Sequence, residues 1–206
     1  VLDVETTSTR TMANLMVGRE VSFETQKKEA EFGEVVLSVE NMNIVNSEKF
    51  PVVKNASFEI HAGEVFAIAG VAGNGQVEIA DAIAGLTELS SGKITLNGVD
   101  ITNMTIRKRL EEGISYIPED RQNFGLVMDF TLSENLGLKQ YYRQPYSKNG
   151  FLNKSAFDAN GNTLIEKYDI RSSNGNETVV RSMSGGNQQK VLLARWMCMN
   201  PKLIIL

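Results

Sequence analysis

Short apolar runs alternate with polar turns along most of this chain, and their spacing predicts a mixed α/β fold. Residues 35–41 and 56–61 alternate between apolar and polar positions, as half-exposed strands do. Residues 93–96 and 99–101 flank the pair Asn97-Gly98, which is a strong two-residue hairpin signal. These four segments predict an antiparallel part of the fold.

Three further runs predict short parallel strands. Residues 65–69, 114–117 and 203–206 are mostly apolar, and helix-compatible segments such as residues 77–83 separate them. Strands joined through helices pair in parallel by right-handed crossovers. The last run follows a helix-stopping Asn200-Pro201 pair and is suited to a central, buried strand.

The stretch between residues 131 and 180 is richer in helix-compatible residues than the flanking segments. One helix is expected to start near Ser133, Glu134 and Asn135, and residues 154–168 form a longer amphipathic stretch. We therefore expect a helical subdomain at about residues 127–183.

A glycine-rich loop separates the expected strand at residues 65–69 from the following helix. It reads, in order, Gly70, Val71, Ala72, Gly73, Asn74, Gly75, Gln76 and Val77. The phosphate-loop pattern has both glycines at this spacing, followed by lysine and then serine or threonine. Because Gln76 and Val77 replace the lysine and the hydroxyl, the sequence predicts weak nucleotide binding and no hydrolysis at this loop.

Two other interpretations of this loop are a dinucleotide fingerprint and a tight turn without a ligand. The fingerprint requires a third glycine where Glu78 stands, so it fails. The ligand-free turn remains open on the loop alone.

A second candidate anion site lies at the head of an apolar helical run. It consists of Ser184, Gly185, Gly186, Asn187 and Gln188. A serine at the N-cap, two glycines that admit close backbone approach and the helix dipole together favour a bound phosphate. The alternative is an ordinary capped helix.

Taken together, these motifs resemble those of an ATP-binding-cassette domain. The matching segments share the order and spacing of that family: residues 57–60, 63–64, 70–76, 91–94, 97–98, 116–121 and 183–195. The chain is similar to the second cassette of the duplicated ATPase subunit of sugar and nucleoside importers. Residues 142–153 look more like the nucleoside branch.

The resemblance implies an asymmetric ATPase with a fold of the P-loop NTPase type. In this family two cassettes sandwich ATP head to tail, so Ser184 to Gln188 would complete a hydrolytic site whose lysine and carboxylates belong to the first cassette. Residues 70–77 would contribute to a second, degenerate site. ATP and Mg²⁺ would act mainly at the shared site, and the chain by itself would be inactive.

The same resemblance implies the partners and the location. The partners would be the first cassette of the same polypeptide, the transmembrane permease and, indirectly, an extracytoplasmic solute-binding protein. The subunit would lie at the cytoplasmic face of the membrane and energise uptake of a nucleoside or simple sugar. A non-hydrolysing regulatory nucleotide-binding module is the alternative function.

Both ends of the chain also fit this resemblance. Residues 1–30 resemble the tail of a preceding cassette and a linker, whereas residues 31–206 resemble a cassette truncated before its metal-binding aspartate. The catalytic glutamate, the dimer-contacting loop and the switch histidine would follow that aspartate. The alternative for the N-terminus is a helix that belongs to this domain.

Several single residues carry narrower expectations. Glu119 and Asp120 occupy the place of the family's metal-contacting glutamine, and Glu119 either faces the permease or caps a helix. His61 is expected in a surface turn, and Cys198 as a buried core thiol. Phe50 could stack on an adenine ring, although packing in the core or in a hairpin explains it equally well.

Composition excludes some classes of function. The net charge is −4 and no stretch is dense in lysine or arginine, which argues against nucleic acid as a partner. A chromosome-maintenance ATPase would also need a long coiled-coil insertion, which the sequence does not show. No apolar stretch reaches the length that a membrane-spanning helix requires, so contact with a membrane would go through a partner.

Overall fold

The computed structural model describes residues 7–17, 20 and 31–206, which fall into two units, Val1–Phe32 and Gly33–Leu206. The first unit holds helix α1 (Thr9–Val17), and Arg10 pairs with Glu20 at 2.7 Å. Residues 21–30, at the end of the expected tail-and-linker segment 1–30, lie outside the described residues. The origin of residues 1–30 therefore remains a prediction.

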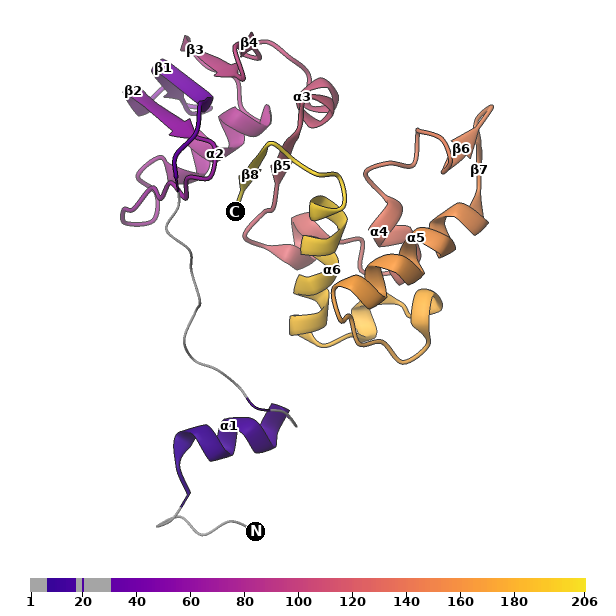
Figure 1. The fold of residues 1–206 in the computed structure, drawn as a ribbon. Helices are drawn as coiled ribbons and strands as arrows, with labels where there is room; N and C mark the ends of the chain where they lie inside the picture. The colour runs from indigo at the N-terminus through magenta and orange to yellow at the C-terminus, as the bar shows by residue number, and fades with distance from the viewer. Residues whose placement is uncertain (1–6, 18–19, 21–30) are drawn as a thin grey trace. The chain divides into compact units, whose positions relative to one another are not determined.

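An antiparallel sheet opens the second unit (Figure 1). Its strands are β1 (Val35–Val45), β2 (Pro51–His61), β3 (Ser91–Leu96) and β4 (Val99–Asp100), in the order β2-β1-β3-β4. The predicted Asn97-Gly98 hairpin is confirmed, and both residues have positive φ, 46° and 78°.

Two of these strands are longer than their apolar alternation predicts. The register between β1 and β2 shifts between the Val39 and Met42 pairs, and Asn41 and Asn55 have φ of 48° and 50°. A bulge of this kind allows a strand to continue past a point where the alternation of apolar and polar residues is broken. The strands therefore pass through polar stretches that end the sequence pattern.

Two parallel strands and two helices complete this part of the fold. Helices α2 (Gln76–Ala84) and α3 (Ile106–Glu112) precede β5 (Ile114–Tyr116), which pairs in parallel with β8 (Leu203–Ile205). One apolar core joins α2 and these strands to the antiparallel sheet. Its buried members are Leu37, Val39, Met42, Ile44, Val53, Ala82, Ile83, Ile94, Leu96, Ile101, Ile114 and Leu203.

The predicted strand at residues 65–69 is wrong in this structure. The segment is not in a sheet, and Val65, Phe66 and Ile68 are 86%, 40% and 44% exposed. A strand needs a neighbour that supplies ladder hydrogen bonds, and no described segment pairs with this one. The segment is apolar, as a buried strand would be, but the described residues include no strand that pairs with it.

The strand at the end of the chain is parallel, as predicted, but it is not fully buried. Leu203 is 8% exposed, whereas Ile204 is 37% exposed and Leu206, just after the strand, is 85% exposed. The two-stranded sheet covers only one side of it. The expectation of a central, buried strand is therefore wrong for the described chain.

The helical part has its own core. It contains α4 (Leu132–Gly137), α5 (Lys154–Lys167), α6 (Gly185–Met197) and the short turns η1 (Arg121–Gly125), η2 (Gly175–Glu177) and η3 (Val180–Ser182). The start predicted near Ser133 is confirmed, because Thr131 caps α4 in a reciprocal capping box with Glu134. The core consists of Leu126, Leu132, Leu136, Leu164, Ile170, Val180, Val191, Leu192, Ala194 and Trp196.

A small hairpin in this part was missed. Strands β6 (Ser147–Lys148) and β7 (Phe151–Leu152) pair across Asn149-Gly150, and both turn residues have positive φ. Asn-Gly was the available signal, but each strand is only two residues long.

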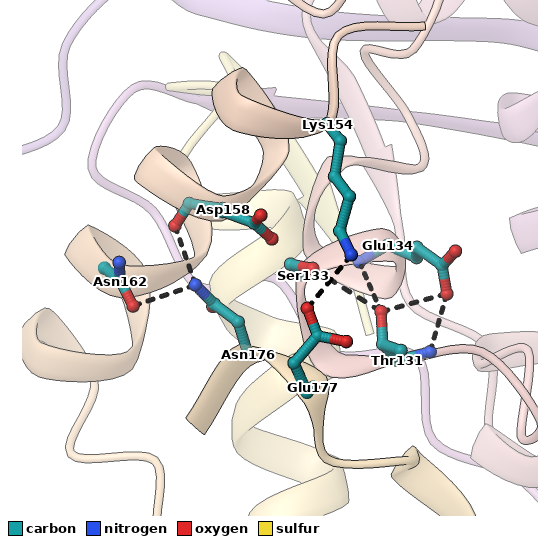
Figure 2. A network of polar contacts seen from close by, with 8 residues as sticks. All are labelled: Thr131, Ser133, Glu134, Lys154, Asp158, Asn162, Asn176 and Glu177. Carbon is teal, nitrogen blue, oxygen red and sulfur yellow. Dashed lines mark hydrogen bonds and ion pairs between the residues drawn. The ribbon is translucent and has the colours of Figure 1, made fainter. Parts of the chain in front are cut away.

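A polar network fixes α5 against η2 (Figure 2). Lys154 pairs with Glu177 at 3.2 Å, and the Asn176 amide donates to the Asp158 carbonyl and to Asn162 Oδ1, both at 2.8 Å. Asn176 also packs directly on Gly161, where a Cβ would lie 2.2 Å from Asn176 Oδ1. The ion pair and the hydrogen bonds of Asn176 therefore serve the packing of α5 against η2.

No helix within the described ranges is both long enough and apolar enough to cross a membrane.

Candidate functional site: two phosphate-type elements

The glycine loop before α2 has the backbone of an anion cradle. Gly73 and Gly75 adopt positive φ of 88° and 98°, and Gly75 is the N-cap of α2 without a side-chain hydrogen bond. No acceptor among the described residues meets the amides of the first turn of α2, because the first helical bond runs from Ile79 to Gly75. The loop therefore presents free N–H groups at a helix N-terminus.

The side chain of Gln76 occupies part of this cradle. Its Nε2 donates to the Val71 carbonyl at 3.3 Å, and a Cβ at Gly70 would lie only 1.9 Å from the same atom. Gln76 therefore lies against the backbone where the family pattern has a lysine. Since the only charged residue in the first turn of α2 is Glu78, that turn supplies no cation to offset a triphosphate.

The donor set of this loop does not fit Mg²⁺. Gln76 offers a neutral amide and Val77 an alkyl group, where magnesium prefers carboxylate, hydroxyl and phosphate oxygens. Across the described ranges, no three His, Cys, Asp or Glu side chains gather closely enough to hold a metal.

The second element, at the head of α6, is open to an opposing surface. Ser184 is the N-cap but its side chain makes no capping bond; instead, Ser184 Oγ accepts from Asn187 Nδ2 at 3.0 Å. The amides of Gly185, Gly186 and Asn187 have no acceptor among the described residues. Ser184 and Gly186 are exposed, so this helix start can bind an anion from outside the fold.

The rest of this motif is structural. Gln188 is 3% exposed, and its Nε2 donates to the carbonyls of Val180 and Met183 at 3.1 and 3.2 Å. Asn187 Oδ1 accepts from the Arg171 amide at 2.9 Å. These bonds hold the helix start in place. Of the five predicted residues, Ser184, Gly185 and Gly186 are therefore the ones at the open end of the helix.

The structure gives Glu119 and Asp120 different roles. Asp120 is the N-cap of η1 and accepts from the amides of Gln122 and Asn123 at 2.9 and 3.0 Å. The amide and side chain of Asn123, with the Gln122 amide, hold the pKa of Asp120 below its usual value. Glu119 is exposed and makes no capping bond, so the capping role suggested for Glu119 belongs to Asp120.

A cavity of about 990 Å³ lies beside these residues. Its wall combines apolar side chains from α2, α3 and α6 with polar groups from the segment that precedes η1. Its lining residues include Asp81, Tyr116, Glu119 and Arg121.

Tyr116 and Asp81 link β5 to α2 at this wall. The Tyr116 hydroxyl donates to Asp81 Oδ1 at 2.7 Å. Burial of the hydroxyl, which is the larger cause, and the hydrogen bond to Asp81 together raise the pKa of Tyr116 to about 12.

Arg109 is the structural residue that sequence analysis missed. It is 4% exposed and donates from Nη1 to the carbonyls of Ala82 and Ile83 at 2.6 and 2.9 Å, at the C-terminal end of α2. It also donates to the carbonyls of Thr102 and Met104 at 2.8 and 3.0 Å. Burial lowers its pKa. A buried arginine in a polar stretch of α3 has no sequence signal of its own.

The narrower expectations have mixed outcomes. His61 ends β2, and its ring lies 3.0 Å from the Gly33 carbonyl, so it is a strand-end residue next to the turn. Cys198 is half-buried rather than fully buried, and burial raises the pKa of its thiol. Phe50 is 63% exposed, so core packing does not explain it. It lies in the hairpin turn between β1 and β2, where its amide donates to Asn46 Oδ1 at 2.9 Å.

Comparison with known families settles what kind of domain carries these elements. The family model described as "ABC transporter" matches residues 53–206, which include both phosphate-type elements. This chain belongs to the ABC transporter family. Its fold is that of an ABC ATPase domain, with an antiparallel sheet and a helical part.

Curated relatives of this ABC domain include two import ATPases. The guanosine import ATP-binding protein NupO of Bacillus subtilis is 45% identical over 204 residues, covering 99% of the chain and 40% of that protein. The nucleoside import ATP-binding protein NupA of Lactococcus lactis is 44% identical, covering 94% of the chain and 38% of that protein. The ABC chain thus spans about two-fifths of the length of these relatives.

Solved ABC structures share the fold at lower identity. A nucleotide-free ATP-binding cassette of an ABC transporter superposes with a TM-score of 0.68 at 22% identity, covering 83% of this chain and 68% of that one. The ADP conformation of the cassette MJ1267 gives a TM-score of 0.65 at 21% identity, covering 83% and 67%. At this identity the likeness shows the fold alone.

Proposed function

We propose that this chain is part of the ATP-binding subunit of an importer that uses ATP hydrolysis to drive uptake of a nucleoside or simple sugar. The family membership and the import functions of the two relatives NupO and NupA support this proposal. In this proposal the chain is the second cassette of a duplicated subunit, as its resemblance to that cassette implies, and the glycine loop without a lysine is consistent with this place.

The proposed mechanism is asymmetric, and the open head of α6 carries the argument. Gly185 and Gly186 present free amides behind the exposed Ser184, whereas Gln76 occupies part of its own cradle with a neutral side chain. The head of α6 (Ser184, Gly185 and Gly186) is therefore suited to act as a lid over nucleotide bound by another cassette. The glycine loop of this chain, by contrast, is a poor cradle for a nucleotide of its own. The lid completes the ATP site of the first cassette.

The lid gains binding energy only when the cassettes close. The free amides meet phosphate oxygens in the closed state and water in the open state. This difference in affinity between the two states is what allows a ligand to drive a conformational change. The permease converts the closing motion into transport.

The remaining partners follow from this assignment. The lysine, the carboxylates and Mg²⁺ of the hydrolytic site belong to the first cassette. The permease anchors the subunit at the cytoplasmic face of the membrane, and an extracytoplasmic solute-binding protein delivers the solute.

The decisive experiment compares two variants of the assembled two-cassette transporter. Ser184→Arg places a bulky cation at the lid, and we expect it to abolish ATP turnover coupled to solute uptake in proteoliposomes. Gln76→Ala alters only the degenerate cradle, and turnover should persist. Full turnover with Ser184→Arg would remove the lid mechanism.

A non-hydrolysing regulatory module is the second candidate, because Gln76 occupies the position of the missing lysine. In that case nucleotide bound at the degenerate loop would control a partner. Gln76→Ala would then change transport, and Ser184→Arg would leave ATP turnover intact. The same pair of variants therefore separates the two functions.

The 206-residue chain alone should show no ATP turnover above background, since neither phosphate-type element has a lysine or a metal-binding carboxylate set. A malachite-green phosphate assay with Mg²⁺ and ATP measures this directly. Robust magnesium-dependent hydrolysis would contradict the proposed division of labour.

A further inference from the structure

Arg121 lies directly beside the open helix start of α6. It begins η1, which follows Asp120, and its guanidinium approaches Gly185. A Cβ at Gly185 would lie 2.8 Å from Arg121 Nη2 and 3.6 Å from Cζ. The guanidinium therefore occupies space that is free only because residue 185 has no side chain.

This position is fixed by contacts between η1 and α6. Gln122 Nε2 donates to Gln188 Oε1 at 3.4 Å, and Arg195 Nη2 donates to the Gly125 carbonyl. Gly125 also packs on Leu192, where a Cβ would lie 3.1 Å from Leu192 Cδ2. Since η1 is held to α6 beyond Arg121 itself, the approach to Gly185 follows from the packing of the two elements.

Arg121 forms no ion pair in the part of the chain that the structure describes, although its charge helps to lower the pKa of the neighbouring Asp120. No carboxylate oxygen lies within ion-pair distance of its guanidinium there, and its Nε is buried without an acceptor. Lys190 and Arg171, the other cations near this helix start, both pair with Asp169, at 3.0 and 3.9 Å.

Asp120, next to Arg121 in the chain, does not neutralise it by contact. Its carboxylate accepts from the Gln122 and Asn123 amides and from Asn123 Nδ2 at 2.6 Å. The guanidinium thus retains donors beside Gly185, which begins a helix whose first three amides also lack acceptors among the described residues. Donors gathered around one opening call for a multivalent anion.

We infer that Arg121 is a nucleotide-binding residue of the lid, which contributes its guanidinium to the triphosphate held at Ser184, Gly185 and Gly186. This inference rests on the proposed function and adds a cation to a lid otherwise made of main-chain amides. A planar guanidinium matches phosphate oxygens in pairs. Gly185 serves this site by leaving room for Arg121.

The test uses the assembled two-cassette transporter and separates charge from structure. Arg121→Gln removes the charge and keeps most of the reach, Arg121→Lys keeps the charge, and Lys148→Gln removes a cation from the exposed β6 strand as a matched control. Steady-state kinetics give kcat and KM for ATP, and thermal melting reports folding.

We expect Arg121→Gln to lower kcat/KM for ATP about 10- to 100-fold, which is the range for losing one charged hydrogen bond. Arg121→Lys should fall between Arg121→Gln and wild type, and Lys148→Gln should match wild type. Gly185→Ala, which displaces the guanidinium, should cause a similar loss, and combining it with Arg121→Gln should add little.

The outcomes distinguish this inference from the proposed function. If Ser184→Arg abolishes turnover while Arg121→Gln stays within twofold of wild type, the lid stands and Arg121 is no part of it. If Arg121→Gln and Arg121→Lys lose the same activity and melt at the same lowered temperature, Arg121 is only structural and the inference fails. If Ser184→Arg has no effect, the proposed function itself fails.

Discussion

Gln76 lies over Gly70, so close that a Cβ at Gly70 would be 1.9 Å from the Gln76 amide nitrogen. The side chain that replaces the family's lysine thus bonds the loop itself, through the Val71 carbonyl. Gln76→Lys should restore a cation to a backbone that already presents free amides. One charged hydrogen bond is worth roughly 1.5–3 kcal/mol, which corresponds to about 10- to 100-fold tighter binding.

Fluorescence titration of the purified chain with a mant-ATP probe measures this gain. Asn103→Lys, which adds the same charge at an exposed turn before α3, is the control and should leave affinity unchanged. Equal affinity of Gln76→Lys and wild type would mean that the loop is a turn without nucleotide-binding capacity.

Arg109 should be a large contributor to stability. Its removal leaves four carbonyls, at Ala82, Ile83, Thr102 and Met104, without their buried donor. We expect Arg109→Ala to lower the free energy of unfolding by about 3–5 kcal/mol, as breaking a buried charged network does. Urea unfolding followed by circular dichroism tests it.

The neighbouring Lys108 supplies the control for that experiment, because it lies exposed on the same helix. Lys108→Ala should change stability by less than about 0.5 kcal/mol. If both alanine variants unfold at the same urea concentration, the carbonyl contacts of Arg109 contribute nothing measurable.

Gly137 is required by the ring of Phe157. A Cβ at residue 137 would lie 2.4 and 2.5 Å from two ring carbons of Phe157. Alanine normally gains roughly 0.5–1 kcal/mol over glycine in a helix, but overpacking costs about 1–3 kcal/mol. We therefore expect Gly137→Ala to be destabilising overall, with a lower midpoint in thermal melting.

A second substitution checks that mechanism. Phe157→Leu removes the ring that the new methyl group meets, so adding it to Gly137→Ala should cost less than Phe157→Leu costs in the wild-type background. Additive losses in the double variant would show that the ring is not the cause.

Tyr116 should make stability depend on pH above pH 10. Its pKa is about 12 in the folded chain because of burial and the bond to Asp81, against roughly 10 when unfolded. The stabilisation by the neutral hydroxyl is therefore complete below pH 10 and is lost as pH rises towards 12. Tyr116→Phe should lack this dependence.

Urea unfolding of wild type and Tyr116→Phe at pH 8 and pH 11 measures the effect. The difference in unfolding free energy between the two proteins should be smaller at pH 11. An identical difference at both values would mean that Tyr116 titrates with the same pKa in both states.

Local signals in the sequence predicted the local structure well. The Asn97-Gly98 hairpin, the start of α4 and the stop at Asn200-Pro201 each depend on one or two residues with restricted backbone preferences. The N-cap position of Ser184 was also predictable, because a serine before two glycines and an apolar run marks a helix start.

Features that depend on distant partners were not predictable. The segment at residues 65–69 has the composition of a strand but no partner in the described sheet. Arg109 is buried because the end of α2 happens to lie beside α3, and Arg121 reaches Gly185 through the packing of η1 on α6. Spacing along the chain gives no information on such contacts.

The uncovered segment at residues 65–69 has a consequence for handling the purified chain. Its main-chain groups lack ladder partners, and Val65 is 86% exposed. Apolar backbone segments without ladder partners can pair with strands of other molecules. We therefore expect the purified chain to aggregate through residues 65–69 at high protein concentration. Val65→Lys should raise the concentration at which the protein precipitates.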